Sequence, residues 1–320
     1  MPQKKYYTFN AYLKNKFGEK VYKVSLDAGF DCPNRDGRLA VGGCTYCDEG
    51  SRAPGIRPEL SIQNQMAQGI ERMKKRYRAK KFIAYFQAFT NTYDRVSVLR
   101  QRYHAALDFP DVVGLSVSTR PDTLSEGALN LLEDIKRHRD KEFEVWLELG
   151  LQTIHDQTHE KLNRWHTYKQ FENALRKARQ KPSLKICAHV ILGLPGETVE
   201  QMTQTIQKVA SLPIDGVKLH LLHVIKNTKL HQDYHRGTFK VFEEDAYIKL
   251  VCDCLEMLPP AMIIHRVTGE AEARKMIAPL WVLNKSRVLH KIDQELARRN
   301  SAQGAKFISP HAQKNDTLSA

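Results

Sequence analysis

Residues 21–26 read VYKVSL, and residues 32–47, a few positions further on, read CPNRDGRLAVGGCTYC. The first stretch is rich in β-branched and aromatic residues and predicts a strand. The second holds three cysteines spaced C-x11-C-x2-C, with three glycines between the first and the second. Thiolates two residues apart commonly bind one metal or cluster, and glycines let the backbone fold tightly around a compact group. A strand that leads directly into a metal-binding loop is therefore the starting point for the fold.

Further strand-like runs follow at fairly even spacing. They are FIAYFQAF at 82–89, VVGLSVS at 112–118, VWLELGLQT at 145–153, KICAHVILG at 185–193 and VKLHLLHVI at 217–225. Amphipathic stretches separate them, at 61–80, 94–107, 124–138, 156–180 and 197–211. Strands that alternate with helices predict a parallel sheet with right-handed crossovers. Six such units predict an α/β fold, an open or closed β/α barrel whose functional residues gather on the loops after the strands.

The regular alternation is lost after residue 226. EEDAYIKLVCDCLEML at 243–258 predicts a helix that two prolines end, MIIHRVTG at 262–269 suggests a short strand, and 279–299 predicts a last helix. From about residue 300 the chain is polar and rich in small residues, which is typical of a mobile tail. We therefore predict a barrel core over 1–225, a mostly helical extension over 226–300 that packs on it, and a mobile tail over 301–320.

The composition indicates a folded and basic protein. Of the 320 residues 42% are hydrophobic, which excludes a wholly disordered or fibrous chain, and the net charge of +14 attracts polyanions such as nucleic acid. The alternative is a basic enzyme with no large partner. Every apolar run is much shorter than a membrane helix requires, and the first residues lack the apolar stretch of a signal peptide. We expect a cytoplasmic protein with no membrane partner.

The other cysteines have a different setting. Cys187 lies in an apolar run, and Cys252 and Cys254 lie in a predicted helix at a spacing that points them apart. We interpret all three as small core residues and predict no second cluster. The three cysteines of 32–47 leave one position of a four-ligand site open. A catalytic metal or cluster needs such an open position to bind a reactant. Zinc with a distant fourth ligand is the alternative.

Polar side chains follow most of the predicted strands. Parallel strands bring their carboxyl ends to one edge of a barrel, so these side chains and the cysteine loop should share one rim. The members are Gln87, Thr90, Asn91 and Thr92 after the second strand, Ser118, Thr119, Arg120 and Asp122 after the third, Glu148 and Gln152 with the fourth, Gly193, Pro195, Gly196 and Glu197 after the fifth, and His220 and His223 on the sixth.

A strand followed by a three-cysteine loop, with GLPGE at 193–197 after the fifth strand, resembles the radical S-adenosylmethionine superfamily. The usual cysteine spacing there is C-x3-C-x2-C, and the longer first gap of this chain is typical of the branch that resembles the elongator catalytic subunit. Within that branch the chain resembles the YtqA/YhcC-type family from about residue 7 to 300. The motifs that carry this resemblance are GFDCPNRDG, GGCTYC, AYFQAFTNTY, STRPD, WLELGLQT, HLLHVIKNT and IIHRVTG.

The resemblance implies a partial barrel of the radical S-adenosylmethionine type and two cofactors. Cys32, Cys44 and Cys47 would bind three irons of a [4Fe-4S] cluster, and the open fourth iron would bind S-adenosylmethionine. The cofactor would then yield a 5′-deoxyadenosyl radical after one-electron reduction. A flavodoxin-like or ferredoxin-like protein is the expected electron donor.

The resemblance also implies positions around S-adenosylmethionine. Gln87, Asn91 and Thr92 would lie at the methionine amino group, although the Gly-Gly-Glu often found there is absent. Ser118 and Arg120 would face the cofactor, Glu148 would accept hydrogen bonds from the ribose, Arg164 would pair with the methionine carboxylate, and Gly193 and Gly196 would let adenine approach the backbone. His265 and Arg266 are assigned to the substrate as catalytic candidates.

Several of these residues have a purely structural alternative. The alternative role of Glu148 is that of a buried ion-pair partner, and the alternative role of Arg164 is that of a helix cap. His220 and His223 are explained as hydrogen-bonded core histidines. The assignments therefore depend on which side chains the fold brings together.

The resemblance implies a tRNA substrate. The family is expected to convert 5-carboxymethylaminomethyl-uridine at the wobble position to 5-aminomethyl-uridine, with no DNA partner. Residues 72–81 carry seven Lys or Arg, and 170–181 form a second basic face; each could bind phosphate or be a solvated helix surface. Two alternatives stay open, a radical enzyme acting on a small metabolite or protein, and a non-catalytic zinc-bearing nucleic-acid-binding module.

Overall fold

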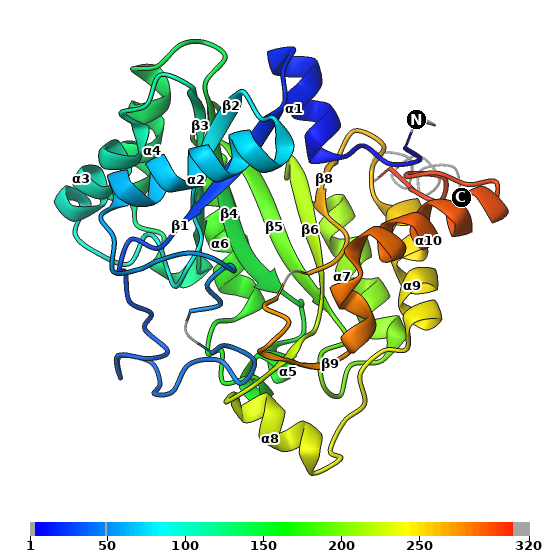
Figure 1. Cartoon of the computed structure of the whole chain (residues 1–320). Coiled ribbons are helices and arrows are strands. Elements are labelled where there is room, and N and C mark those ends of the chain that lie inside the picture. Colours follow the sequence, from blue (N-terminus) through cyan, green and yellow to red (C-terminus); the bar gives the residue numbers. More distant parts are fainter. Residues whose placement is uncertain (1–3, 49, 270, 310–320) are drawn as a thin grey trace, which may run out of the picture.

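The computed structural model describes residues 4–48, 50–269 and 271–309. Its centre is a curled parallel sheet of seven strands in the order β1-β2-β3-β4-β5-β6-β8 (Figure 1). The strands are β1 Val21–Leu26, β2 Lys81–Phe86, β3 Val112–Thr119, β4 Glu144–Gln152, β5 Lys185–Leu192, β6 Gly216–Leu221 and β8 Ile263–Arg266. Neighbours in space are neighbours in sequence for the first six strands, as repeated right-handed crossovers require. The predicted partial β/α barrel is confirmed.

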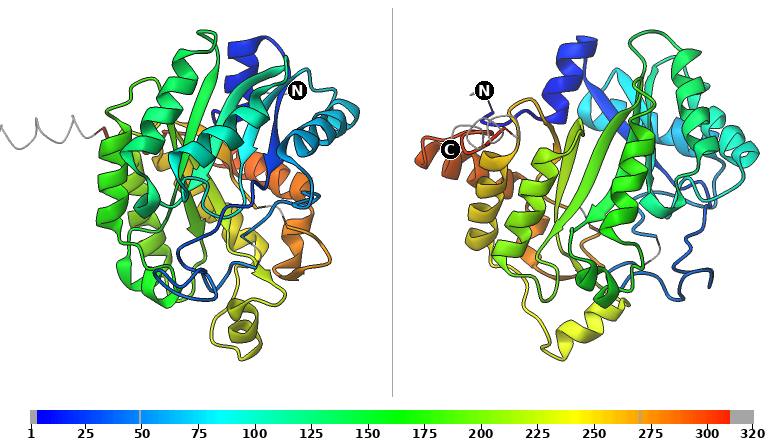
Figure 2. Two further views of the ribbon diagram at one scale, coloured as in Figure 1. Left: turned by 90° about the vertical axis from the view of Figure 1, so that its left-hand side faces the viewer. Right: turned by 180° about the vertical axis from the view of Figure 1, so that it is seen from behind.

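Helices cover the outside of the sheet (Figures 1 and 2). They are α2 Ile62–Tyr77, α3 Val96–Leu107, α4 Glu126–Arg137, α6 Tyr168–Ala178, α7 Val199–Ser211 and α9 Glu244–Met257, with α10 Lys285–Arg298 packed on α9. Helix α1, Phe9–Phe17, lies at the end where the strands begin, whereas α5 Asp156–Lys161 and α8 Lys229–His235 lie at the other end. None of the helices in the described part of the chain combines the length and the apolar character needed to cross a bilayer.

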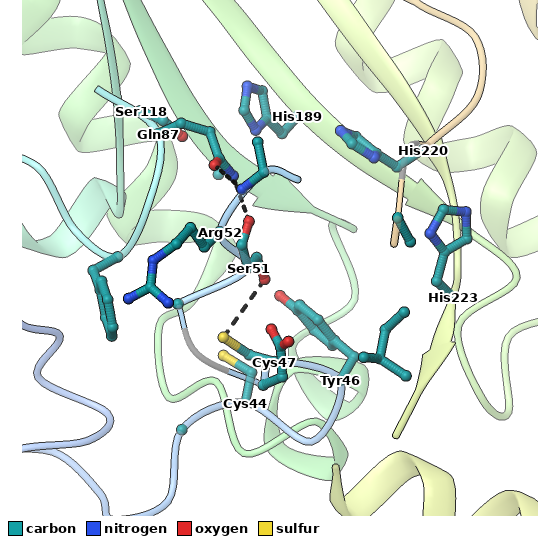
Figure 3. A pocket seen from close by; sticks show the side chains of 18 of the residues that line it. Cys44, Tyr46, Cys47, Ser51, Arg52, Gln87, Ser118, His189, His220 and His223 are labelled. Atoms are coloured by element: carbon teal, nitrogen blue, oxygen red, sulfur yellow. Dashed lines mark hydrogen bonds between the residues drawn. The ribbon is translucent and has the colours of Figure 1, made fainter. Parts of the chain in front are cut away.

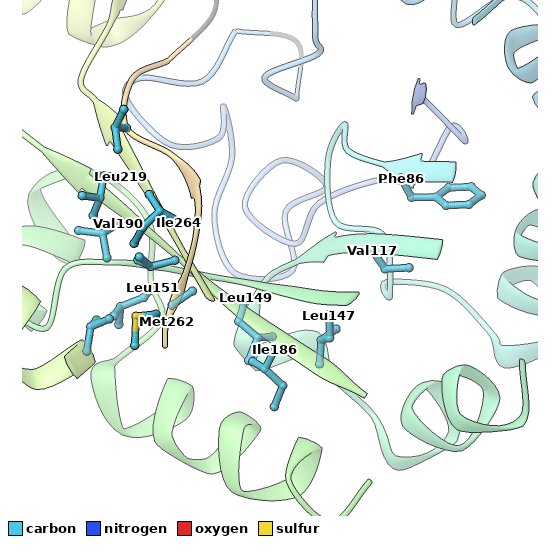
Figure 4. Close-up of a cluster of buried hydrophobic side chains, with 14 of the residues drawn as sticks. Phe86, Val117, Leu147, Leu149, Leu151, Ile186, Val190, Leu219, Met262 and Ile264 are labelled. Carbon is cyan, nitrogen blue, oxygen red and sulfur yellow. The ribbon is translucent and has the colours of Figure 1, made fainter. Parts of the chain in front are cut away.

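The main hydrophobic core lies between the sheet and these helices (Figure 4). Along β4, Leu147, Leu149 and Leu151 point to this core, while the residues between them point to the inside of the curl. Cys252 and Cys254 are fully buried here, whereas Cys187 is buried in a smaller cluster with Trp146 and Ile263. Side chains of a strand alternate between the two faces of the sheet. The outer face is therefore apolar, and the inner face carries polar side chains such as that of Glu148.

Three predicted elements differ in extent from the observed ones. The short strand expected near 262–269 is β8, which pairs in parallel with β6 and so extends the sheet beyond the six predicted units. The run 217–225 is divided into β6 and β7, Val224–Ile225, and β7 pairs instead with β9, Met276–Ala278. The stretch 156–180 is divided into α5 and α6, because Asn163 and Trp165 between them adopt positive φ angles of 54° and 56°.

The start of the expected mobile tail is attached to the barrel. The Gln303 side chain accepts a hydrogen bond from the Tyr7 amide at 2.8 Å and donates to the carbonyls of Pro259 and Met262. Lys306 pairs with the buried carboxylate of Glu256. Residues 301–309 thus satisfy buried polar groups of the barrel; residues 310–320 lie outside the described residues, and the mobility of the tail stays a prediction.

A buried carboxylate links the strands from the inside of the curl. Glu148 on β4 accepts hydrogen bonds from Ser116 at 2.6 Å and His189 at 2.7 Å, and from Lys23 and Lys218. Lys218 also donates to the Tyr85 hydroxyl at 2.8 Å. Members of this group come from each of the first six strands.

The two lysines of this group keep the buried carboxylate of Glu148 ionised. Burial would raise the pKa of Glu148, but Lys218, Lys23 and His189 outweigh it and hold the pKa well below its usual value. Burial, followed by the charge of Lys218, lowers the pKa of His189 to about 4, so its ring is neutral near pH 7 and can donate to the carboxylate.

The substitution Glu148→Gln tests this arrangement. It leaves the buried Lys218 and the partly buried Lys23 without their carboxylate, and we expect it to lower the free energy of unfolding by about 3–5 kcal/mol. Urea unfolding followed by circular dichroism measures the change. Glu160→Gln, at an exposed position on α5, is the control and should change stability by less than about 0.5 kcal/mol. Equal stability of the two variants would contradict a structural role for Glu148.

Candidate functional site

A cavity of about 420 Å³ opens at the ends of the strands, next to the cysteine loop (Figure 3). Cys32, Cys44 and Cys47 all line it. Its walls also include Tyr46, Ser51, Arg52, Gln87, Ser118, Arg120, Arg164, His189, His220, His223, Arg266, Glu272, Arg274 and Lys275. The volume lies within the range of small-molecule sites, roughly 300–1,000 Å³. The predicted meeting of the cysteine loop with strand ends is therefore observed at one cavity.

The cysteine loop is shaped by its own backbone hydrogen bonds. The amides of Arg35 and Asp36 donate to the Cys32 carbonyl, and the Cys47 amide donates to the Cys44 carbonyl at 2.9 Å. Gly43 has a φ of 81°, and a Cβ there would lie 2.7 Å from the Arg35 guanidinium. The positive φ favours glycine before Cys44, and any larger residue there would also have to displace the Arg35 side chain.

The loop is also fastened to the far side of the barrel. The Thr45 amide donates to the Leu162 carbonyl at 2.9 Å, and the Leu230 amide donates to the Thr45 carbonyl at 2.8 Å. Asn163 donates from its side chain to the Gly43 carbonyl at 2.8 Å. These contacts position the cysteines over the ends of the central strands, although the loop begins at the edge strand β1.

Hydrogen-bond donors surround two of the sulfurs. Cys44 Sγ lies 3.5 Å from the Asn34 amide nitrogen and 3.7 Å from the Arg164 guanidinium. Cys47 Sγ lies 3.5 Å from the Ser51 hydroxyl and 3.9 Å from the Arg35 guanidinium. Donors of this kind stabilise sulfur that carries negative charge, as thiolate ligands do.

The cysteines do not gather with other ligand types around one point. Burial, followed by the neighbouring Cys44, raises the pKa of the Cys47 thiol to about 11. Within the described ranges, His, Cys, Asp and Glu side chains form no group of three or more that could hold a single metal ion. Three thiolates that each bind a different iron of a cluster are not required to meet at one ion.

Of the four residues predicted after β2, Gln87 and Thr90 line the cavity as the described residues define it, and Asn91 and Thr92 do not. Gln87 is the one of the three predicted cofactor residues that does so. Its side chain donates to the Ser51 carbonyl at 2.6 Å and accepts from the Ala53 amide at 2.8 Å, so it orders the segment after the cysteine loop (Figure 3). Asn91 donates to the Ser118 carbonyl, and Thr92 bonds the Thr119 hydroxyl. Both are buried and organise the loop behind the wall.

Two of the predicted arginines stand side by side in the wall. Arg120 pairs with Asp122 at 2.8 Å and donates to the Arg164 carbonyl, while its Nη1 is buried with no hydrogen-bond partner in the described structure. Arg164 donates to the Gly150 carbonyl at 3.0 Å and to the Tyr46 hydroxyl at 3.1 Å. It lies beside Cys44 and does not cap a helix.

Three further predicted cofactor residues, besides Asn91 and Thr92, lie outside the lining of the cavity as the described residues define it. Both carboxylate oxygens of Glu148 accept hydrogen bonds from the interior group described above. These contacts are the ones expected if Glu148 is a buried ion-pair partner. Gly193 and Gly196 have φ angles of 87° and 84°; a Cβ on Gly193 would lie 3.0 Å from the Phe242 ring. Their positive φ shapes the loop after β5, and the space beside Gly193 is filled by protein.

The two predicted catalytic residues lie at an irregularity of β8, where the pairing with β6 shifts and leaves His265 without a partner strand residue. His265 is partly buried near the other end of the barrel, where its ring stacks on Phe9 at 4.0 Å and packs against Trp146 at 4.4 Å. Arg266 lines the cavity, together with Ser118 and the histidines of β6 and its loop. Among the described residues, Arg266 belongs to the lining of the cavity and His265 does not, and a contact of either with the substrate stays a prediction.

The sequence analysis missed several residues of the site. The cavity is also lined by His189, Tyr46, Arg52 and Lys275. In the barrel interior next to it, Lys23 and Lys218 hydrogen-bond Glu148. The available signal was a lysine or histidine inside an otherwise apolar strand, as in VYKVSL and KICAHVIL. Such a residue in a barrel strand faces an inner surface that has polar partners.

Comparisons with known proteins agree with this architecture. The Radical SAM superfamily model matches residues 35–209, more than half of the chain, and the Radical_SAM C-terminal domain model matches 214–298. The uncharacterized protein YtqA of Bacillus subtilis is 42% identical over 307 residues, which cover 95% of this chain and 94% of YtqA. Protein YhcC of Escherichia coli K12 is 38% identical over 94% of this chain and 96% of YhcC.

More distant similarities lie in the elongator branch. A tRNA uridine(34) acetyltransferase of Methanocaldococcus infernus is 24% identical over 182 residues, which cover 56% of this chain and 33% of that protein. The solved structure of Elp3 from the same organism matches with a TM-score of 0.67 at 18% identity, over 88% of this chain and 64% of the Elp3 chain. The match to Elp3 shows a common fold. From these matches, the chain belongs to the radical S-adenosylmethionine superfamily and, within it, to the group that includes YtqA and YhcC.

Proposed function

We propose that this protein is a radical S-adenosylmethionine enzyme that converts 5-carboxymethylaminomethyl-uridine at the wobble position of tRNA to 5-aminomethyl-uridine. The observation that carries the proposal is the cavity at the strand ends, where three cysteines of one loop meet a wall rich in arginine. The radical chemistry rests on the superfamily and on this geometry. The choice of tRNA rests on relatives and on charge.

The cysteine loop has the chemistry of a ligand set for a [4Fe-4S] cluster. Cys32, Cys44 and Cys47 supply three thiolates, and the donors around Cys44 and Cys47 suit sulfur that bears negative charge. A bound cluster and S-adenosylmethionine would supply one-electron cleavage of the sulfonium and a 5′-deoxyadenosyl radical.

The cavity walls supply the contacts for S-adenosylmethionine. Arg164 and Arg120 provide positive charge for the methionine carboxylate, and the unpartnered Nη1 of Arg120 is a ready donor. Gln87 and Ser118 line the remaining wall. Asn91, Thr92, Glu148, Gly193 and Gly196 act in this proposal by holding the walls in place.

The substrate side of the cavity is basic. Arg52, Arg266, Arg274 and Lys275 contribute to its lining. Three of them pair with carboxylates, Arg52 with Asp27, Arg274 with Glu272 and Lys275 with Asp48. Cations in the wall suit a substrate that carries a carboxylate and phosphates, which would compete for these pairs. The printed name of the Methanocaldococcus relative, an acetyltransferase of tRNA uridine 34, supports the same class of substrate.

One observation favours the alternative of a small metabolite or protein substrate. The basic run 72–81 lies where α2 ends and β2 begins, and Lys80 and Lys81 donate to the Lys20 carbonyl just before β1. This is the end of the barrel opposite to the cavity. The run is therefore not placed beside the reacting base, and tRNA would have to contact it from a distance. The zinc-module hypothesis is set aside because the chain belongs to an enzyme superfamily.

The cysteine assignment predicts the iron content of the protein. Anaerobically reconstituted wild type should hold about four irons and show the brown absorbance of a [4Fe-4S] cluster, whereas Cys44→Ala should lose most of both. Cys252→Ala, at a buried cysteine away from the cavity, is the matched control and should keep them. Iron analysis and ultraviolet-visible spectra measure the outcome. Full iron in Cys44→Ala would contradict the assignment.

The tRNA assignment predicts a change in cellular nucleosides. Deletion of the gene should cause 5-carboxymethylaminomethyl-uridines to accumulate and the aminomethyl and methylaminomethyl products to disappear, as mass spectrometry of digested tRNA detects. A plasmid copy should restore the profile and a Cys44→Ala copy should not. Identical profiles with and without the gene, in a strain with no second route to these nucleosides, would reject tRNA as the substrate and favour the small-molecule or protein alternative.

A further inference from the structure

Three large apolar side chains are exposed on the outer side of the cysteine loop. We call Leu39, Val41 and Trp165 the rim patch; their exposed fractions are 46%, 73% and 51%. Two of them belong to the loop between Cys32 and Cys44, and the third follows Arg164. Exposed apolar groups that gather in one place commonly mark an interaction surface.

The rim patch is built by specific hydrogen bonds. The side chain of Asn163 donates to the Val41 carbonyl at 3.3 Å and accepts a hydrogen bond from the Trp165 indole at 2.5 Å. Trp165 has a φ of 56°, a conformation that costs free energy for a large residue and that is concentrated at functional sites. The fold therefore holds an indole in solvent at a cost and ties it to the cysteine loop.

The patch lies over the proposed cluster ligands but outside the cavity. Asn34 joins the two regions, because its side chain donates to the carbonyls of Asn163 at 2.6 Å and Arg164 at 3.0 Å and lies 3.5 Å from Cys44 Sγ. None of the three patch residues is among the described residues that line the cavity, whereas the segments around Ser51 and Lys275 are. A molecule on the patch would be close to Cys44 without blocking the basic wall of the cavity.

We propose that the rim patch is the docking surface for a small acidic protein that carries one electron. The inference rests on the cluster part of the proposed function and is independent of the tRNA substrate. The carrier gives up one electron and is oxidised, and the group held by the three cysteines gains that electron and is reduced. No atom is transferred. The surface therefore needs only to hold the carrier close to the group that the three cysteines bind and to release the carrier rapidly afterwards.

Size and charge support this occupant. Interfaces for electron transfer are small and short-lived, with an apolar centre and a charged rim, so three apolar side chains suffice. The exposed Arg38 next to Leu39 is balanced by the exposed Asp36, while the whole chain carries a net charge of +14. The net charge would attract an acidic carrier to the protein, and the apolar side chains of the rim patch would fix where it docks. The competing occupant is an RNA base stacked on Trp165.

Binding of a flavodoxin tests the proposal without any cofactor chemistry. We expect Val41→Glu to raise the Kd for oxidised flavodoxin by about tenfold or more at low salt, because it removes an apolar contact and repels an acidic partner. Val41→Lys should raise the Kd less. Leu280→Glu, at an apolar residue that is 61% exposed on another part of the surface, is the matched control and should change the Kd by less than about twofold. Fluorescence anisotropy of labelled flavodoxin measures all four proteins.

A second readout separates this proposal from the proposed function. In reconstituted protein with S-adenosylmethionine, Val41→Glu should slow the formation of 5′-deoxyadenosine with reduced flavodoxin but not with dithionite. If wild type forms no 5′-deoxyadenosine with either reductant, the proposed chemistry is rejected. The Kd values for flavodoxin would still test whether the rim patch is its docking surface. Unchanged flavodoxin affinity in Val41→Glu would overturn the docking proposal, and a loss of tRNA affinity instead would assign the patch to RNA.

Discussion

The carboxylate of Glu148 is the interaction on which the half-barrel depends. It receives hydrogen bonds from β1, β3, β5 and β6, and Lys218 extends the network to Tyr85 on β2. The opening above this group can hold polar chemistry because the polar groups beneath it already hydrogen-bond one another. Without the carboxylate, two ammonium groups would face each other in a space that excludes most water. The polar interior therefore serves both the closure of the sheet and the floor of the site.

The cysteine loop depends on the same closure. It begins at the edge strand β1 but is fastened to the segment after β4 through Asn34, Thr45 and Asn163. The strands must curl for these groups to meet. One strip of backbone, residues 162–165, then receives the loop, places Arg164 beside Cys44 and presents Trp165 to solvent. The hydrogen bonds to the cysteine sulfurs, the wall of the cavity and the exposed rim patch consequently all depend on the positions of residues 162–165.

The positive charge of the chain has two different origins. Part of it lies at the cavity, in Arg52, Arg266 and Lys275. Another part lies in the last turns of helices, as at Lys74–Arg76 of α2 and Arg176–Lys177 of α6, where cations interact favourably with the helix dipole. Net charge alone therefore does not identify an RNA-binding face, and the location of each charge decides its meaning.

The sequence by itself determined the order of strands and helices and the cysteine loop, because periodicity and ligand spacing are local properties of the chain. It also placed Gln87, Ser118, Arg120 and Arg164 near the cysteines, since parallel strands end at one edge. Only the tertiary structure decided that Glu148 is enclosed by lysines 125 and 70 residues away, that β8 joins the sheet, and that His265 and Arg266 separate. These outcomes depend on the direction in which the sheet curls and on the face each residue takes, and side chains distant in the chain set both.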